Sequence, residues 1–299
     1  MKRAENDAFS RCHPLVSFSF FVGAIGFGAL ILHPAYIMAA MIFAVVYYVL
    51  LHGMKGWKTV LLTIPLFAAV SFLNPLVNPD GQKVLTHVFG RPYTYEALVY
   101  GMVIAGMLVV MLLWAGCYNA VMTSDKFMTL FGSLIPSISL LLLMVLRLVP
   151  NMIRKIVQLY GARKCIGKGA SENASRKEKT MDALNVLSAL MTWAIEGGII
   201  TADTMVSRGY GTNKRTSFQI HRLTRQDWML LGIMASLAVA VIVLIAGGGT
   251  AANYTPHMTI APVSGSFLLG FAAYCVFLSL PTVLYIKETI QWHISRSKI

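Results

Sequence analysis

Two arginines in the central part of the chain stand in short motifs that could make a specific charged contact with another molecule. The motifs are Ala162-Arg163-Lys164 and Ser207-Arg208-Gly209. A guanidinium group forms planar, bidentate hydrogen bonds with carboxylates and carbonyl groups. Each motif falls at the end of a predicted helix, where a cation is favoured because the last carbonyl groups lack partners. Either motif alone fits ordinary helix capping, whereas two on successive helices predict a docking function.

Other side chains that often carry chemistry are scattered along the chain. The four cysteines form no C-x-x-C pair, and the seven histidines form no H-x-x-x-H or H-E-x-x-H motif. Zinc sites and disulfide frameworks depend on such spacings. We therefore interpret the cysteines as idle or buried thiols and predict that the chain holds no metal ion.

One glycine-rich segment is similar to a nucleotide-binding loop but does not satisfy its pattern. The phosphate-binding loop of ATPases reads G-x-x-x-x-G-K-[ST] and follows a strand. In the segment 161–169 the first glycine spacing is one residue too long, and Gly169 stands where the magnesium-holding hydroxyl should be. We predict that this chain binds no nucleotide or other cofactor itself.

The acidic and basic residues do not suggest an enzyme or a nucleic-acid-binding protein. Only Glu96 and Asp125 lie near the ends of apolar stretches, and no acid lies inside one, which argues against a proton-coupled carrier. Arg147, the one charge deep in an apolar stretch, fits a snorkelling side chain. No G-x-S-x-G motif is present, and basic residues do not alternate with aromatic ones as in base-stacking surfaces.

The composition places the two arginines in a membrane protein. The chain has 299 residues, of which 57% are hydrophobic and 12% charged, and its formal net charge is +13. A soluble domain has about 25% charged residues. So apolar and yet so basic a chain is typical of a polytopic membrane protein, and we predict an all-α fold that crosses the bilayer several times.

Seven apolar stretches are candidates for membrane spans, which need about 20 helical residues. They cover 15–32, 35–51, 59–73, 97–118, 127–149, 228–247 and 266–286. The basic residues before the first stretch are similar to the start of a signal peptide. No small-x-small cleavage site follows, so we interpret this stretch as the first span.

The distribution of charge predicts how the spans are oriented. The segment 150–226 holds thirteen basic and five acidic residues, and the N-terminal tail is basic as well, so both are expected in the cytoplasm. Seven spans would place 150–226 outside. The stretch 127–149 is interrupted by Pro136 and several serines and runs directly into the basic segment. We therefore predict six spans, cytoplasmic termini, and a helix over 127–149 that lies at the inner leaflet.

The basic segment contains two predicted amphipathic helices, 150–163 and 181–206, separated by a stretch of loop composition. The polar stripe of 181–206 indicates an interfacial or domain helix rather than a span. The chain is then divided into N-terminal transmembrane helices (1–126), a cytoplasmic or interfacial domain of coupling helices (127–226) and C-terminal transmembrane helices (227–299).

In order and spacing, several motifs resemble the transmembrane (T) component of energy-coupling factor ABC transporters, a family related to the membrane subunit of cobalt and nickel uptake systems. They are Asn74-Pro75-Leu76, the segment 94–101, Met122-Thr123-Ser124-Asp125, the segment 146–150 and the two arginine motifs. The resemblance extends over 15–285. It implies a helical membrane bundle with cytoplasmic coupling helices.

The resemblance also implies partners. In that family each motif arginine docks on one of two ATP-binding subunits, which hold ATP and magnesium, and the coupling helices tip a small substrate-binding membrane (S) component that carries a vitamin or metal ion. On this chain the docking residues would be Ala162, Arg163, Lys164, Ser207, Arg208 and Gly209. Lys164 replaces the usual glycine, and Ser207 replaces the usual alanine. The chain itself would be non-catalytic and would lie in the cytoplasmic membrane.

A second binding surface is predicted on the stretch 127–149. If this helix does not span, its apolar residues exceed what its own fold needs, and they would seat the substrate-binding partner. These residues are Leu140, Leu141, Leu142, Leu143 and Val145.

Two readings of the chain from other classes of protein remain open. A self-contained membrane carrier or lipid-modifying enzyme would use Arg163 and Arg208 to hold lipid phosphates. A purely structural membrane scaffold would bind partners without depending on their ATP hydrolysis.

Overall fold

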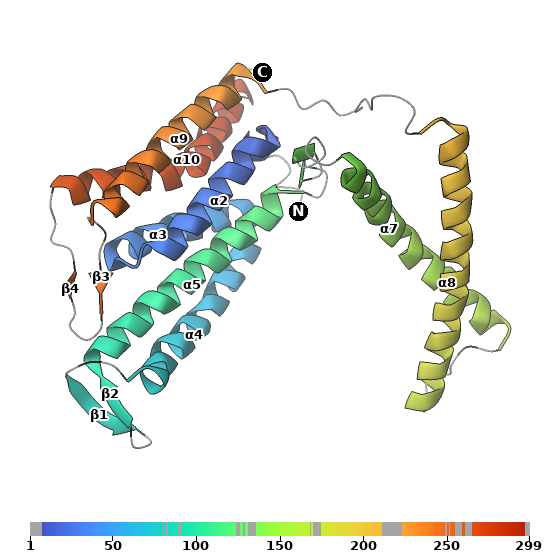
Figure 1. Ribbon diagram of the computed structural model, residues 1–299, viewed down its shortest axis with the longest axis horizontal. Helices are drawn as coiled ribbons and strands as arrows, with labels where there is room; N and C mark the ends of the chain where they lie inside the picture. Colours follow the sequence, from blue (N-terminus) through green and yellow to red (C-terminus); the bar gives the residue numbers. More distant parts are fainter. Residues whose placement is uncertain are drawn as a thin grey trace. The chain divides into compact units, whose positions relative to one another are not determined.

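The computed structural model describes most of the chain. The described residues are 8–79, 81, 83–88, 91–123, 126–127, 129–130, 136–167, 169, 175–210, 223–248, 250, 252–254, 259–260 and 265–296. The helices are α1 (Ala8–Arg11), α2 (Pro14–Leu30), α3 (Pro34–His52), α4 (Met54–Val77), α5 (Tyr95–Val121), α7 (Pro136–Cys165), α8 (Arg176–Ser207), α9 (Arg225–Ala246) and α10 (Gly265–Arg296). The strands are β1 (Val84–Val88), β2 (Arg91–Thr94), β3 (Ala252–Asn253) and β4 (Thr259–Ile260), paired in two antiparallel hairpins (Figure 1).

The chain divides into two compact units. The first, here called the bundle, is formed by both ends of the chain, Met1–Phe127 and His221–Ile299. The second, here called the central unit, is inserted between them and covers Met128–Ile220. Its described helices are α7 and α8. The two arginine motifs therefore belong to a unit with its own helix packing.

Six of the described helices are long and apolar enough to cross a membrane, so the chain is an all-α, multi-pass membrane protein. They are Pro34–His52, Gly56–Val77, Tyr95–Val121, Arg176–Ser207, Arg225–Ala246 and Gly265–Trp292. Five of these coincide with predicted spans. The first predicted span is the shorter α2 with 17 residues, and α8 has the length and hydropathy of a span although its polar stripe predicted an interfacial helix.

The central unit differs from the prediction in two helix boundaries. α8 begins at Arg176, before the predicted start at 181, because Ser175 and Glu178 form a capping box there. The sequence predicts a change of helix near residue 150, but α7 runs without a break from Pro136 to Cys165 and includes Pro150. The apolar first half and the basic second half belong to one rod. A change of side-chain polarity does not by itself end a helix, and Pro150, which lacks an N–H, removes one of the backbone hydrogen bonds without ending it. Residues 131–135, where the prediction also placed helix, lie outside the described residues.

The core of the bundle is aromatic and lies between α2, α3, α5 and α10. Trp114 of α5 is fully buried, with its ring centroid 5.4 Å from that of Phe20 and 6.0 Å from that of Tyr47. Phe20 also stacks on Phe277 of α10 at 5.2 Å. Aromatic pairs at these separations contribute about 0.5–1.5 kcal/mol each beyond their burial. The two ends of the chain are thereby joined in one core.

The ends of the first helices are fixed by local sequence. α2 and α3 each begin with a proline, whose missing N–H costs nothing at the first helical position. The histidine before each proline accepts a hydrogen bond from the next free N–H: His13 Nδ1 from Leu15 and His33 Nδ1 from Ala35. The corner between α2 and α3 is then held by Tyr254, whose hydroxyl donates to the carbonyl of Leu32 at 2.8 Å. Burial raises the pKa of Tyr254 to about 12, so this donor keeps its proton even above the pH at which an exposed tyrosine ionises.

The hairpin β1–β2 is anchored to the start of α5 by a buried carboxylate. Glu96 accepts hydrogen bonds from the backbone N–H of Lys83, at 3.2 Å for the nearer oxygen. Thr94 caps α5 by accepting from the N–H of Ala97. Glu96 therefore has a structural function: it closes the loop between α4 and α5.

α4 and α5 approach each other most closely at a glycine. A Cβ atom on Gly101 would lie 2.7 Å from the carbonyl oxygen of Ser71 and 2.9 Å from Cβ of Asn74. The Asn74 amide also donates across this contact to the carbonyl of Ala97 at 3.2 Å. Only a residue without a side chain allows the two backbones to come this close.

We expect Gly101→Ala to push α4 away from α5 and to lower the free energy of unfolding by about 1–3 kcal/mol, the usual cost of overpacking. Thermal denaturation of the purified protein in detergent measures the loss. Gly26→Ala is the matched control, because a Cβ there meets nothing within 4 Å. Equal melting temperatures for the two variants would contradict the close approach.

Candidate functional site

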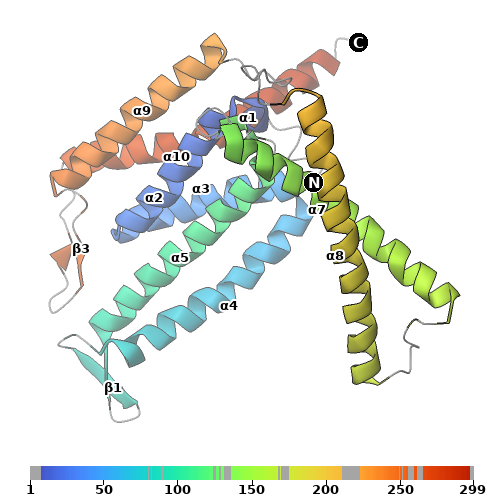
Figure 2. The same cartoon turned by 45° about the vertical axis from the view of Figure 1, so that its right-hand side comes forward.

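The central unit is held together by a narrow contact between α7 and α8. On α8 the buried residues are Asp182, Val186 and Leu190, spaced four apart on one face. The contacts across the pair show that the helices are antiparallel, since Arg163 meets Asp182 while Lys155 lies over the ring of Trp193, 5.5 Å from its centroid. Figure 1 and Figure 2 show the two helices crossing each other, so that they are in contact over only part of their length. This pairing positions both arginine motifs.

Arg163 is engaged inside the central unit. Its Nε donates to Oδ1 of Asp182 at 2.7 Å, and a terminal guanidinium nitrogen lies 2.7 Å from the same oxygen. The side chains of Arg163 and Asp182 are 24% and 7% exposed. An ion pair this poorly hydrated fixes the register of two helices, because leaving either charge unpaired there is costly. Sequence reasoning missed Asp182, which is an ordinary acidic residue until α8 is placed against α7.

Arg208 is exposed at the end of α8. It is the last residue before Gly209, which has φ +69° and ends the helix. The Gly209 N–H donates to the carbonyl of Val206 and the Tyr210 N–H to that of Met205, both at 3.0 Å. These two hydrogen bonds form a Schellman motif, the usual way in which glycine stops a helix. Among the described residues no side-chain ion pair or hydrogen bond of Arg208 is found.

The two arginines do not occupy equivalent positions. α7 also ends with a left-handed glycine, Gly167 at φ +69°, but Arg163 lies four residues before it, whereas Arg208 directly precedes Gly209. Both arginines lie at the C-terminal end of a helix, as predicted, but Arg163 lies nearly one helical turn farther from its glycine than Arg208 does. The offset turns Arg163 toward α8 and leaves Arg208 beyond the helix contact.

The other residues of the two motifs are exposed. Ala162 and Lys164 lie on the solvent-accessible side of α7 near its end, and Ser207 and Gly209 flank Arg208. The Ser207 hydroxyl donates to the carbonyl of Asp203 at 2.9 Å, so it is satisfied within its own helix. The Ser207 hydroxyl thus adds no outward-pointing hydrogen-bond donor beside Arg208.

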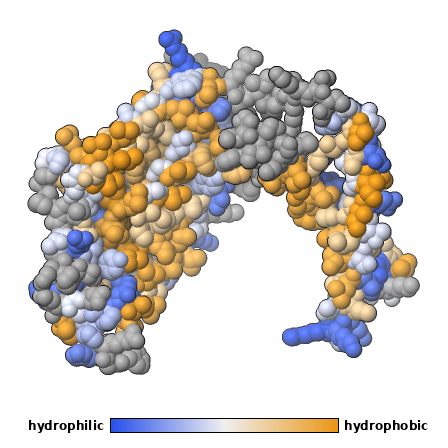
Figure 3. Space-filling model, viewed as in Figure 1, coloured by the Kyte–Doolittle hydropathy of each residue, from blue (hydrophilic) through white to orange (hydrophobic). Residues whose placement is uncertain are grey.

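The predicted partner-binding residues lie on the first half of α7. Leu141, Leu142, Leu143 and Val145 are exposed, while the side chain of Leu140 lies outside the described residues. Exposed apolar side chains continue along α8. They include Leu184, Leu187, Met191, Ile195 and Ile199. Figure 3 shows hydrophobic residues covering parts of both central helices. The structure therefore leaves a large apolar surface on this unit, of which the predicted seat is one part.

Neither the family models nor the curated proteins contain a match to this chain. In the described parts of the chain no group of three or more His, Cys, Asp and Glu side chains could hold a metal ion. The two arginine motifs and the apolar surface of the central unit are thus the features on which a function can be argued.

We expect Arg163→Ala to loosen the α7–α8 pair, because it leaves the carboxylate of Asp182 buried without its cation. The expected loss is about 2 kcal/mol, equivalent to about 30-fold faster amide hydrogen exchange over 182–194. The exchanged pair Arg163→Asp with Asp182→Arg should restore part of the protection. Arg154→Ala, at an exposed arginine of the same helix, should leave the exchange unchanged. A similar effect of both alanine variants would show that the ion pair does not hold the helices.

Proposed function

We propose that this chain is the membrane-embedded coupling subunit of an ABC importer of the energy-coupling factor type. It transmits the ATP-driven motion of two ATP-binding subunits to a small membrane protein that binds a vitamin or a transition-metal ion. ATP and magnesium belong to the partners, and the chain itself catalyses no reaction. The bundle sits in the cytoplasmic membrane with both termini and the central unit facing the cytoplasm.

The observation that carries the proposal is the exposed guanidinium of Arg208 at the end of a rigid helix. The Schellman motif fixes the backbone on both sides of this residue. A residue held in this way gives up little backbone freedom on binding, and the planar donors of its guanidinium match carboxylates and helix carbonyls in a groove. A helix of 32 residues behind it provides a stiff lever.

Arg163 contributes differently to the same interface. Because Asp182 holds its guanidinium, Arg163 has to share or release this ion pair before it docks. We assign Arg208 the stronger direct contact and Arg163 a combined role, in which it orders the end of α7 and presents the neighbouring Lys164. The two ATP-binding subunits would then be held with unequal strength.

The apolar first half of α7 is proposed as the seat of the substrate-binding protein. It carries Leu140, Leu141, Leu142, Leu143 and Val145 in one continuous helix with Arg163. Motion imposed at the C-terminal end of α7 would therefore reach the apolar end through a single helix that includes Pro150.

A membrane carrier or a lipid-modifying enzyme is the alternative from another class. Its arginines would hold lipid phosphates, and the purified chain would act alone. The exposed position of Arg208 fits either ligand. Co-purification separates the two functions, because only a coupling subunit retains two ATP-binding proteins.

We expect Arg208→Ala to weaken the binding of one ATP-binding subunit at least about 30-fold, since a lost charged contact at an interface costs about 2–5 kcal/mol. Affinity purification from the native membrane, followed by mass spectrometry, measures which subunits are retained. The matched control is Arg176→Ala, at an exposed arginine in the first turn of the same helix. Retention of both subunits with normal uptake in Arg208→Ala would refute the proposed docking.

We expect Leu141→Glu to release the substrate-binding protein while both ATP-binding subunits stay bound, because a charge on the seat must be desolvated for the contact to form. Ile195→Glu on α8 is the control, since Leu141 and Ile195 are 62% and 60% exposed. The measurement is the ratio of co-purified subunits. Equal loss of the substrate-binding protein in both variants would place its seat elsewhere on the central unit.

A further inference from the structure

The first described residues of the chain, Ala8–His13, are firmly attached to the bundle. Phe9 is buried, and its ring meets those of Phe20 and Phe21 edge to face at 5.3 and 6.0 Å. The Ser17 hydroxyl donates to the carbonyl of Phe9 at 3.2 Å. This short segment before α2 is thus an integral part of the bundle core.

The same segment binds the chain just before it enters the central unit. The ammonium group of Lys126 donates to the hydroxyl of Ser10 at 2.8 Å and to the backbone carbonyl of the same residue. It also donates to the carbonyl of Val121, the last residue of α5, at 2.8 Å. One cation therefore joins the end of α5 to α1 and caps a helix end, where positive charge is favoured. The next residue, Phe127, is the last residue of the first of the two stretches that form the bundle.

The segment also binds the chain just after it leaves the central unit. The backbone N–H of His13 donates to Oδ1 of Asp227 at 3.2 Å. The other carboxylate oxygen of Asp227 accepts from the N–H and the hydroxyl of Thr224 at 2.9 and 2.7 Å, which closes the capping box at the start of α9. Asp227 is buried, so its charge depends on these donors.

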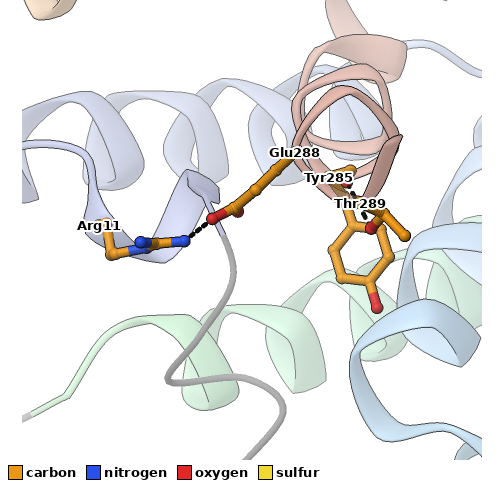
Figure 4. A network of polar contacts seen from close by, with 4 residues as sticks. All are labelled: Arg11, Tyr285, Glu288 and Thr289. Atoms are coloured by element: carbon orange, nitrogen blue, oxygen red, sulfur yellow. Dashed lines mark hydrogen bonds and ion pairs between the residues drawn. The ribbon is translucent and has the colours of Figure 1, made fainter. Parts of the chain in front are cut away.

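A third contact fixes the segment to the end of the bundle. Arg11 forms an ion pair with Glu288 near the end of α10, next to the turn in which the Thr289 hydroxyl donates to the carbonyl of Tyr285 (Figure 4). α1 packs against α10 along this contact. The short segment therefore touches the end of α5, the start of α9 and the end of α10.

We propose that Ala8–His13 is a clamp that holds the two connections of the central unit at a fixed spacing. Lys126 precedes the central unit and Asp227 follows it, and both are bonded to residues only three positions apart, Ser10 and His13. On the proposed function, this clamp makes the bundle follow the central unit. Without it, the end of α5 and the start of α9 would move separately.

The physical reason lies in how a motion passes between two helical units. Rigid helices transmit displacement, whereas a connection with unsatisfied backbone groups and few contacts moves independently. The clamp joins the end of α5 and the start of α9 in one polar cluster, which is anchored to the core by the buried Phe9. The polar residues of the clamp are accordingly positioning residues that do not touch a substrate. They are Ser10, Arg11, Lys126 and Asp227.

The clamp is tested first without any partner. Lys126→Met removes the cation but keeps the length of the side chain, so amide hydrogen exchange of the purified chain in lipid nanodiscs should rise about tenfold in both 121–127 and 223–230. Lys126→Arg should retain most of the protection. Lys287→Met, at an exposed lysine of α10, is the control and should change neither region. Faster exchange confined to 121–127 would overturn the clamp, because the two connections would then be independent.

The second test uses the complete transporter in proteoliposomes. Lys126→Met should leave ATP hydrolysis within about twofold of the unaltered complex and lower the substrate imported per ATP by about tenfold. An unchanged ratio, together with faster exchange at both connections, would overturn the role of the clamp in transmission. Failure to obtain any ATP-binding partner would instead contradict the proposed function, and the exchange measurement alone would then decide whether the clamp exists.

Discussion

The bundle depends on one constraint: two ends of the chain, separated by the whole central unit, must fold into a single core. The aromatic contact among Phe20, Trp114 and Phe277 meets this constraint, because it brings α2, α5 and α10 together in the protein interior. Once these helices are joined, the end of α5 and the start of α9 both reach the segment Ala8–His13. The two points at which the chain leaves and re-enters the bundle are thus brought together by how the aromatic core closes.

The central unit is stabilised by a different kind of contact. Its helices share a narrow apolar stripe, and an ion pair between Arg163 and Asp182 fixes their register. Much of their apolar surface is left exposed, which is the observation behind the proposed seat for a membrane partner. Arg163 fixes the register inside the unit, whereas Arg208 stays exposed. The two arginines proposed as docking residues are therefore not equivalent.

The sequence predicted the fold class and most of the spans, because long apolar runs that contain almost no charged residues are a strong signal. It also located the C-terminal end of α8 closely, since Gly209 stops a helix through its own conformational freedom. The predicted start at 181 was too late, because Ser175 and Glu178 form a capping box that begins the helix at Arg176. It predicted two helices where α7 is continuous. The polarity of the side chains changes near Pro150, but the backbone stays helical through this point. It could not decide which of α2 and α8 crosses the membrane, since the length and hydropathy of a helix do not say which of its surfaces is in contact with lipid.

For the candidate site, the residue types were determined by the sequence and their roles by the tertiary structure. The arginines, the exposed apolar runs, the capping residues and the excess of positive charge are local properties, readable from neighbours a few positions apart. The partners of Arg163, Lys126 and the His13 backbone are not local: Asp182, Ser10 and Asp227 lie from 19 to 214 positions away along the chain. Which of these charges is buried, and which stays exposed, depends on the faces that the helices present to each other, and only packing decides that.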